Sequence, residues 1–258
     1  MTPAWLTAVP FAHRGLHAPD TGRAENTLPA FAAAAERGYG IELDVRLSAD
    51  GVPVVFHDAT LDRVTFGRGP VAALPIATLR EQRFREGQAG IPALAEALEL
   101  VGGRVPLLVE VKSPFSRCDP AGYLAPIVGL LVAYRGPVAA MSFDPEIVRT
   151  LRHLAPALPR GILGDGVRDM QTWGRLPAVQ RFGIRHFLHW PSTRPDFIGY
   201  DADLLPSAAP TLLRRLAGVA MLAWTVRSAA DRARALRHAD QVIFEGFLPE
   251  LAAGRAAA

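Results

Sequence analysis

Three carboxylates lie on two candidate strands at a spacing that lets them act together. Glu42 and Asp44 are two residues apart in G-I-E-L-D-V, and Glu110 stands in L-V-E-V-K. Alternate residues of a strand point to the same side, so Glu42 and Asp44 face one way. If the two strands are neighbours, the three carboxylates converge, and in a partly dry site they repel one another unless a cation neutralises them. Oxygen ligands of this kind favour a divalent cation such as Mg²⁺, Ca²⁺ or Mn²⁺.

Basic and imidazole side chains also fall at strand ends. The first candidate strand ends on His13 and Arg14, the third ends on Lys112, and a short extended segment ends at His57. Lys112 is the single lysine among 28 basic residues, which fits either a place that needs a compact ammonium group or chance survival of one lysine in an arginine-rich chain. This set suits phosphoryl chemistry. A cation and Lys112 would stabilise an anionic pentacoordinate transition state, and two histidines could serve as base and acid.

Each of these residues also has a purely structural interpretation. His13 could be a buried, hydrogen-bonded histidine, and Arg14 could belong to a structural ion pair. Glu110 and Lys112 could pair with each other on an exposed strand face. Together, however, these interpretations require five separate coincidences at strand ends, which is where barrel enzymes carry their catalytic residues, so we favour a functional site.

Three further residues are less specific. Asn26 could be no more than a helix cap. Trp224 fits the barrel core or a pocket wall equally, and we include it among the candidate substrate-binding residues. Glu245 could be a partner of a site residue or lie on the rim, and it receives no role.

Short apolar runs alternate with helical patterns along the chain, which predicts an α/β fold. Eight candidate strands in 258 residues indicate a (β/α)8 TIM barrel. No G-x-G-x-x-G or P-loop follows a strand, which argues against a doubly wound open sheet. Segment 170–190 is ambiguous and is assigned as helix. The candidate strands are 9–13, 40–45, 106–112, 138–143, 159–163, 197–201, 221–226 and 241–245.

Residues 46–90 interrupt the alternation. S-A-D-G-V-P-V-V-F-H-D predicts a turn at Asp50-Gly51 and a short strand ending at His57. Residues 59–90 are expected to be irregular, with one short helical piece near 77–84. We predict a small insertion after strand 2, within a single domain spanning 1–258, on the face where it could shape a pocket.

Composition and charge exclude several classes of protein. Cys118 is the only cysteine, so an intrachain disulfide and a zinc site of several thiolates are excluded. We expect no signal peptide and no integral membrane segment, because the longest apolar run, 123–134, is too short to span a bilayer. The net charge of +3 is dispersed, which gives nucleic-acid binding little support and suits a small anionic substrate. A cytoplasmic protein is predicted; the oligomeric state stays open.

An ordered set of short motifs resembles the glycerophosphodiester phosphodiesterase family. The similarity runs from residue 9 to about 249, nearly the whole chain, and the ordered set is far more specific than H-R-G alone. The matching pieces are A-H-R-G at 12–15, E-N-T at 25–27, G-I-E-L-D-V at 40–45, H-D-A-T-L-D-R at 57–63, L-V-E-V-K at 108–112, S-F-D at 142–144 and A-W-T-V at 223–226.

The resemblance implies a TIM barrel that hydrolyses a glycerophosphodiester to sn-glycerol 3-phosphate and an alcohol. It implies one bound Mg²⁺ or Ca²⁺ and an acid–base pair of histidines. Which histidine is the acid stays open, and a path through a cyclic phosphate is as compatible as direct attack by water. The implied roles are metal binding by Glu42, Asp44 and Glu110, acid–base catalysis by His13 and His57, phosphate contact by Arg14 and Lys112, and completion of the metal and phosphate shell by Glu25 and Asn26.

Two departures from the family pattern bear on the substrate. The insertion is often larger, so the pocket size and the leaving group stay open. The last strand usually ends in an aspartate-rich turn, whereas this chain has F-E-G-F-L-P-E at 244–250. Two alternatives remain. A lysophospholipase D would need an apolar groove, and a non-catalytic phosphodiester-binding module would predict loss of a histidine or a carboxylate, although none is missing. The insertion offers Phe66, Leu74, Ile76 and Phe84 for such a groove, but these could simply pack on the barrel.

Overall fold

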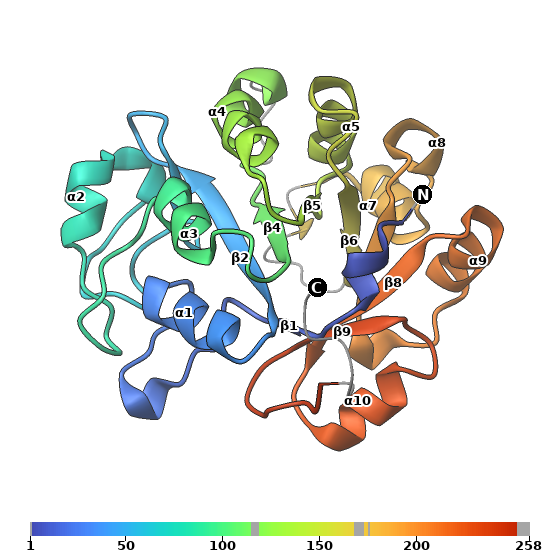
Figure 1. Ribbon diagram of the computed structural model, residues 1–258. Helices are drawn as coiled ribbons and strands as arrows, with labels where there is room; N and C mark the ends of the chain where they lie inside the picture. Colours follow the sequence, from blue (N-terminus) through green and yellow to red (C-terminus); the bar gives the residue numbers. More distant parts are fainter. Residues whose placement is uncertain (1, 115–118, 168–172, 175, 252–258) are drawn as a thin grey trace.

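The computed structural model describes residues 2–114, 119–167, 173–174 and 176–251. Cys118 and parts of segment 170–190 lie outside the described residues. A ring of parallel strands forms the centre of the molecule, and helices surround it (Figure 1). The ring closes because β1 (Phe11–Ala12) pairs with both β2 (Gly40–Leu47) and β9 (Gln241–Phe244). Between them follow β4 (Leu107–Val111), β5 (Val138–Ser142), β6 (Arg160–Gly164), β7 (Phe197–Asp201) and β8 (Ala220–Val226). The prediction of a (β/α)8 barrel is confirmed.

The helices lie between successive strands. Helix α5 begins at Pro145, because Asp144 accepts a hydrogen bond from the backbone N–H of Glu146 and proline fits the first helical position. Within the described residues, the helices all fall short of the length and apolar character that crossing a membrane requires. The bounds are α1 (Leu28–Glu36), α2 (Ile76–Glu81), α3 (Leu94–Val101), α4 (Pro120–Ala133), α5 (Pro145–Leu154), α7 (Ala178–Arg185), α8 (Trp190–Thr193), α9 (Ala208–Ala217) and α10 (Ala229–Ala235), with short 3-10 turns at Ala4–Thr7, Pro19–Thr21, Val71–Ala73 and Ala202–Leu204.

Strand β1 is shorter than the predicted strand 9–13. It ends at Ala12 because Arg14 and Gly15 both have positive φ angles, 55° and 78°, and turn the chain away from the sheet. A Cβ atom on Gly15 would lie 2.8 Å from Cδ1 of Phe31 in α1, so only glycine fits this turn. The turn therefore leaves His13 and Arg14 at the open end of the barrel.

The segment between β2 and α3 forms a small layer beside the barrel (Figure 1). Strand β3 (Pro53–Val55) pairs antiparallel with the end of β2, and α2 follows it. This layer has an apolar cluster of its own, so it is more ordered than the irregular segment expected for 59–90. The cluster contains Ala24, Val54, Phe56, Leu61, Val71, Leu79, Phe84 and Ile91.

Alternation along the strands sorts side chains between the inside and the outside of the ring. On β4, Leu107, Val109 and Val111 pack outward in the large core shared with the helices. Leu108 belongs instead to the apolar cluster inside the ring. Glu110 is two residues further along and points to the same side as Leu108. The interior is thus apolar at the start of the strands and polar at their carboxyl ends.

Candidate active site

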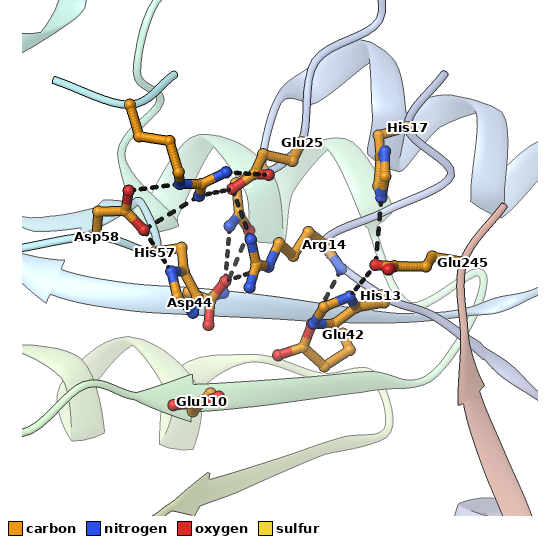
Figure 2. A network of polar contacts seen from close by, with 12 residues as sticks. His13, Arg14, His17, Glu25, Glu42, Asp44, His57, Asp58, Glu110 and Glu245 are labelled. Atoms are coloured by element: carbon orange, nitrogen blue, oxygen red, sulfur yellow. Dashed lines mark hydrogen bonds and ion pairs between the residues drawn. The ribbon is translucent and has the colours of Figure 1, made fainter. Parts of the chain in front are cut away.

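Three buried carboxylates meet inside the carboxyl end of the barrel (Figure 2). Asp44 and Glu110 are direct neighbours in the pairing of β2 with β4, and Glu42 is two residues before Asp44. One carboxylate oxygen from each residue lies within 4.8 Å of the others. The exposed fractions of Glu42, Asp44 and Glu110 are only 2%, 1% and 7%. The structure therefore brings together the three residues that the sequence singles out as metal ligands.

Lys112 and Arg14 supply positive charge to this cluster. The Lys112 Nζ atom lies 2.9 Å from Oδ1 of Asp44 and 2.6 Å from Oε1 of Glu110. The Arg14 Nε atom lies 3.5 Å from Oδ2 of Asp44. Burial by itself raises the pKa of Asp44, but Lys112, His57 and Arg14 together hold that pKa well below its usual value. Burial likewise opposes the charge of Lys112, yet Asp44 and Glu110 keep its pKa raised.

Glu42 is the carboxylate that these cations do not fully compensate. It accepts a hydrogen bond of 2.9 Å from the backbone N–H of Arg14. Burial, followed by the negative charges of Asp44 and Glu110, raises the pKa of Glu42 well above its usual value. The cluster therefore lacks positive charge when all three groups are ionised. A set of buried oxygen donors with this deficit fits a hard divalent cation such as Mg²⁺ or Ca²⁺.

His13 is held by a carboxylate from the last strand. Its Nδ1 atom lies 2.6 Å from Oε2 of Glu245, directly after β9. The Oε1 atom of Glu245 accepts a hydrogen bond of 2.8 Å from Nε of Arg227, and His17 Nε2 lies 3.8 Å from Oε2. Burial lowers the pKa of His13 although the bond to Glu245 opposes it. Glu245 thus fixes the ring through Nδ1 and leaves Nε2 as the nitrogen open to other partners.

His57 is held in the same way by its sequence neighbour. The His57 Nδ1 atom lies 2.6 Å from Oδ1 of Asp58, and Asp58 also accepts a bond of 2.6 Å from Nε of Arg63. Arg63 in turn donates to Glu25, which accepts a second bond from Arg14 (Figure 2). Burial raises the pKa of Asp58, but His57 and Arg63 outweigh it and lower that pKa. A continuous chain of ion pairs therefore joins the two histidine-bearing loops.

Asn26 orients a carboxylate and does not cap a helix. Its Nδ2 atom donates to Oδ2 of Asp44 at 2.7 Å, and its Oδ1 atom accepts from the Asp44 backbone N–H at 3.2 Å. Thr27 occupies the N-cap position of α1. Glu25, by contrast, forms ion pairs with Arg14 and Arg63. Among the described residues, it is not part of the cluster of three carboxylates whose spacing suits a metal ion.

A cavity of about 690 Å³ opens onto these groups. His13, Arg14, His57 and Lys112 line one part of it, and Trp224 lines another. Trp224 also packs against the apolar cluster inside the ring, so it serves as both core residue and pocket wall. Its buried Nε1 atom makes no hydrogen bond within the described part of the chain.

Sequence reasoning missed Arg46, and it named Glu245 as a possible partner of a site residue without assigning it a role. Arg46 donates from Nε to the backbone oxygen of His57 at 2.9 Å and lines the cavity. It stands two residues after Asp44 on the same strand, so the alternation that selected Asp44 also points to Arg46. Glu245 follows β9 at the place where His13 follows β1, and no local pattern connects residues 232 positions apart.

The fold and the site together define a barrel protein whose polar residues gather at the carboxyl ends of its strands, as catalytic residues of barrel enzymes do. The chain matches the model of the glycerophosphoryl diester phosphodiesterase family over residues 13–244. The chain therefore belongs to this family, and the sequence-based assignment to it is confirmed. The prediction that the protein is an enzyme, a phosphoric diester hydrolase, is confirmed as well.

Relatives and solved structures agree with this assignment. A glycerophosphodiester phosphodiesterase from Caldanaerobacter subterraneus subsp. tengcongensis is 36% identical over an alignment of 237 residues, with 88% of each chain covered. An Oleispira antarctica phosphodiesterase, solved in complex with the product sn-glycerol-3-phosphate, is similar with a TM-score of 0.71 and 25% identity, covering 91% of each chain. A glycerophosphodiester phosphodiesterase from Thermotoga maritima has a TM-score of 0.67 and 25% identity, over 92% of this chain and 94% of that one.

Proposed function

We propose that the protein hydrolyses glycerophosphodiesters to sn-glycerol 3-phosphate and an alcohol, with His13 and His57 as the acid–base pair. The observation that supports this proposal is that both histidines have the same kind of hydrogen-bonded partner. Each histidine is bound through Nδ1, at 2.6 Å, to its own carboxylate, and both line the cavity of the buried acidic cluster. The carboxylates fix the imidazole rings, so a proton exchanges with substrate at Nε2. Either histidine can be the acid, and direct attack by water and a cyclic phosphate path use the same two rings.

Glu42, Asp44 and Glu110 would hold one divalent cation, Mg²⁺ or Ca²⁺. When bound, this cation supplies positive charge that stabilises the anionic transition state at phosphorus. The raised pKa of Glu42 supports the assignment, because it marks a cluster short of positive charge.

Lys112 and Arg14 would bind the phosphate group. An ammonium group has three donors, and the contacts of Lys112 with Asp44 and Glu110 use two of them. The third donor is left for a phosphate oxygen. Arg14 lines the same cavity and supplies a second cationic side chain there. Glu25 orients Arg14, and Asn26 orients Asp44, each through a side-chain hydrogen bond.

Release of sn-glycerol 3-phosphate from glycerophosphocholine and glycerophosphoethanolamine tests this function. We expect turnover with Mg²⁺ or Ca²⁺, no turnover with EDTA, and loss of turnover in His13→Ala and His57→Ala. His153→Ala is the matched control, because His153 is exposed on α5. Turnover that survives both active-site substitutions would refute the acid–base assignment. Stabilisation by metal without any wild-type turnover would favour a phosphodiester-binding module.

A second candidate function is lysophospholipid hydrolysis of the phospholipase D type. A groove of about 1180 Å³ adjoins the cavity and shares Arg46, Ala59 and Ser113 with it. Its lining is rich in apolar side chains, including Leu47, Pro70, Ile147 and Ile184. Choline release from lysophosphatidylcholine that exceeds release from glycerophosphocholine would favour this alternative.

The groove is not formed by the insertion residues that the sequence offered for it. Phe84 is buried against Phe56, and Leu74 and Ile76 pack on the small cluster of the insertion. Phe66 is exposed, with the guanidinium of Arg85 over its ring. These four side chains are absent from the linings of both cavities.

A further inference from the structure

One wall of the catalytic cavity is aromatic. Phe143, directly after β5, and Trp224, in β8, have ring centroids 5.4 Å apart and ring planes at 88°. Both line the cavity and both are only partly buried. Trp173 is buried, lines the same cavity and packs edge-on against Phe143, with centroids 6.1 Å apart. Phe143 and Trp224 thus form a right-angled corner, which we call the aromatic corner.

A carboxylate stands next to this corner. Asp165, directly after β6, lines the cavity and accepts a hydrogen bond of 2.8 Å from Nε1 of Trp173. Its other oxygen accepts from the backbone N–H of Val167, also at 2.8 Å. Both of these donors are neutral, and the ion pairs found among the described residues do not include Asp165. Its negative charge is therefore available to a cation in the cavity.

The proposed phosphate-binding cations and the aromatic corner lie on different strands of the cavity wall. The cations proposed to bind phosphate come from β1 and β4, whereas the aromatic corner and Asp165 come from β5, β6 and β8, further around the ring. Arg227 also lines the cavity, but it is bound to Glu245 and its side chain is 60% exposed. With a divalent cation bound at Glu42, Asp44 and Glu110, the side formed by β1 and β4 suits the phosphate anion, whereas the side that carries Asp165 suits a cation.

We infer that the aromatic corner and Asp165 form a subsite for the cationic leaving group of the substrate, a quaternary ammonium alcohol of the choline type. This inference rests on the proposed function and extends it to a substrate class. An aromatic face attracts a cation within about 6 Å of the ring centroid, and two faces at a right angle surround such a group on two sides. Leu163 and Met141 line the same cavity and offer apolar contact to methyl groups. A primary ammonium group gains less, because it loses hydrogen bonds to water against these apolar surfaces.

A neutral isostere isolates the contribution of charge. The 3,3-dimethylbutyl ester of glycerol phosphate has the shape of glycerophosphocholine with carbon in place of the ammonium nitrogen. We expect kcat/KM to be about tenfold or more higher for the choline ester, as a desolvated cation–aromatic contact allows. Phe143→Leu and Asp165→Asn should each lower this ratio, whereas Phe182→Leu, at an exposed position on α7, should leave it unchanged.

The outcomes separate the two proposals. Equal kcat/KM values for the two esters in the wild type would overturn the subsite and leave the phosphodiesterase function standing. Absence of turnover with both esters would count against the function, and the subsite is then tested by binding alone. Choline should quench tryptophan fluorescence at concentrations about tenfold lower than 3,3-dimethylbutanol does. Equal binding of the two alcohols would overturn the subsite whether or not the protein is active.

Discussion

A divalent cation should stabilise this protein against unfolding, and the effect should depend on Glu42. A ligand that binds the folded state alone, present at 100 times its dissociation constant, adds about 2.7 kcal/mol to the free energy of unfolding. For a chain of this size that corresponds to an increase in Tm of about 5–10 °C. We expect Mg²⁺ or Ca²⁺ to produce an increase of this order over EDTA, measured by differential scanning calorimetry.

The substitution Glu42→Gln should change which protein is more stable: the variant in EDTA, and the wild type in the presence of the cation. It removes one of three buried negative charges and keeps the shape of the side chain and an oxygen that accepts from the Arg14 N–H. In EDTA the variant should be at least as stable as the wild type. With the cation it should lose most of the increase in Tm. Glu99→Gln, at an exposed position on α3, is the matched control and should show the full increase.

The dependence on pH gives a second signature of Glu42. Its pKa is raised in the folded, metal-free protein, so above its ordinary value of 4.5 the folded state binds more protons than the unfolded state. The free energy of unfolding of the metal-free protein should therefore decrease as the pH rises from 4.5 through the raised pKa of Glu42. Glu42→Gln should remove that contribution. A variant that is destabilised in EDTA yet keeps the full cation effect would refute the reasoning.

Three further substitutions test other parts of the structure. Glu245→Gln should lower kcat about tenfold or more, with a smaller change in KM, because His13 loses its charged partner; an unchanged kcat would contradict this role. Burial lowers the pKa of His189 to about 4. The free energy of unfolding, measured in urea, should therefore decrease by up to about 3 kcal/mol between pH 6.5 and pH 4, and His189→Gln should abolish that decrease. Gly15→Ala should lower the free energy of unfolding by about 2 kcal/mol, since the turn has positive φ and Phe31 leaves no room for a methyl group; an unaltered urea midpoint would argue against strain there.

Local periodicity was enough to predict the part of the site that lies on two adjacent strands. The spacing of Glu42 and Asp44 determines which side of β2 they occupy, and an alternating β/α pattern makes β2 and β4 neighbours in the barrel. The convergence with Glu110 follows from these two facts. Arg46 follows from the same alternation and could have been predicted with them.

Contacts between distant loops could not be predicted in this way. The bond between His13 and Glu245 depends on closure of the ring, and the pairing of Arg63 with Glu25 depends on how the insertion packs. Both are side-chain contacts across long stretches of chain, which no spacing rule encodes. The length of β1 was overestimated for a related reason, because the positive φ angle of Arg14 reflects its tertiary surroundings and not its residue type.

Closure of the ring between β1 and β9 has a consequence for biosynthesis. His13 is synthesised before the carboxylate that holds it, because Glu245 lies 232 residues further along the chain. A nascent chain that stops before β9 leaves β1 with an unpaired edge and His13 without its partner. Such a partial chain therefore exposes an edge strand that can pair with other chains until β9 docks, and the position of the His13 ring is fixed only at that late step.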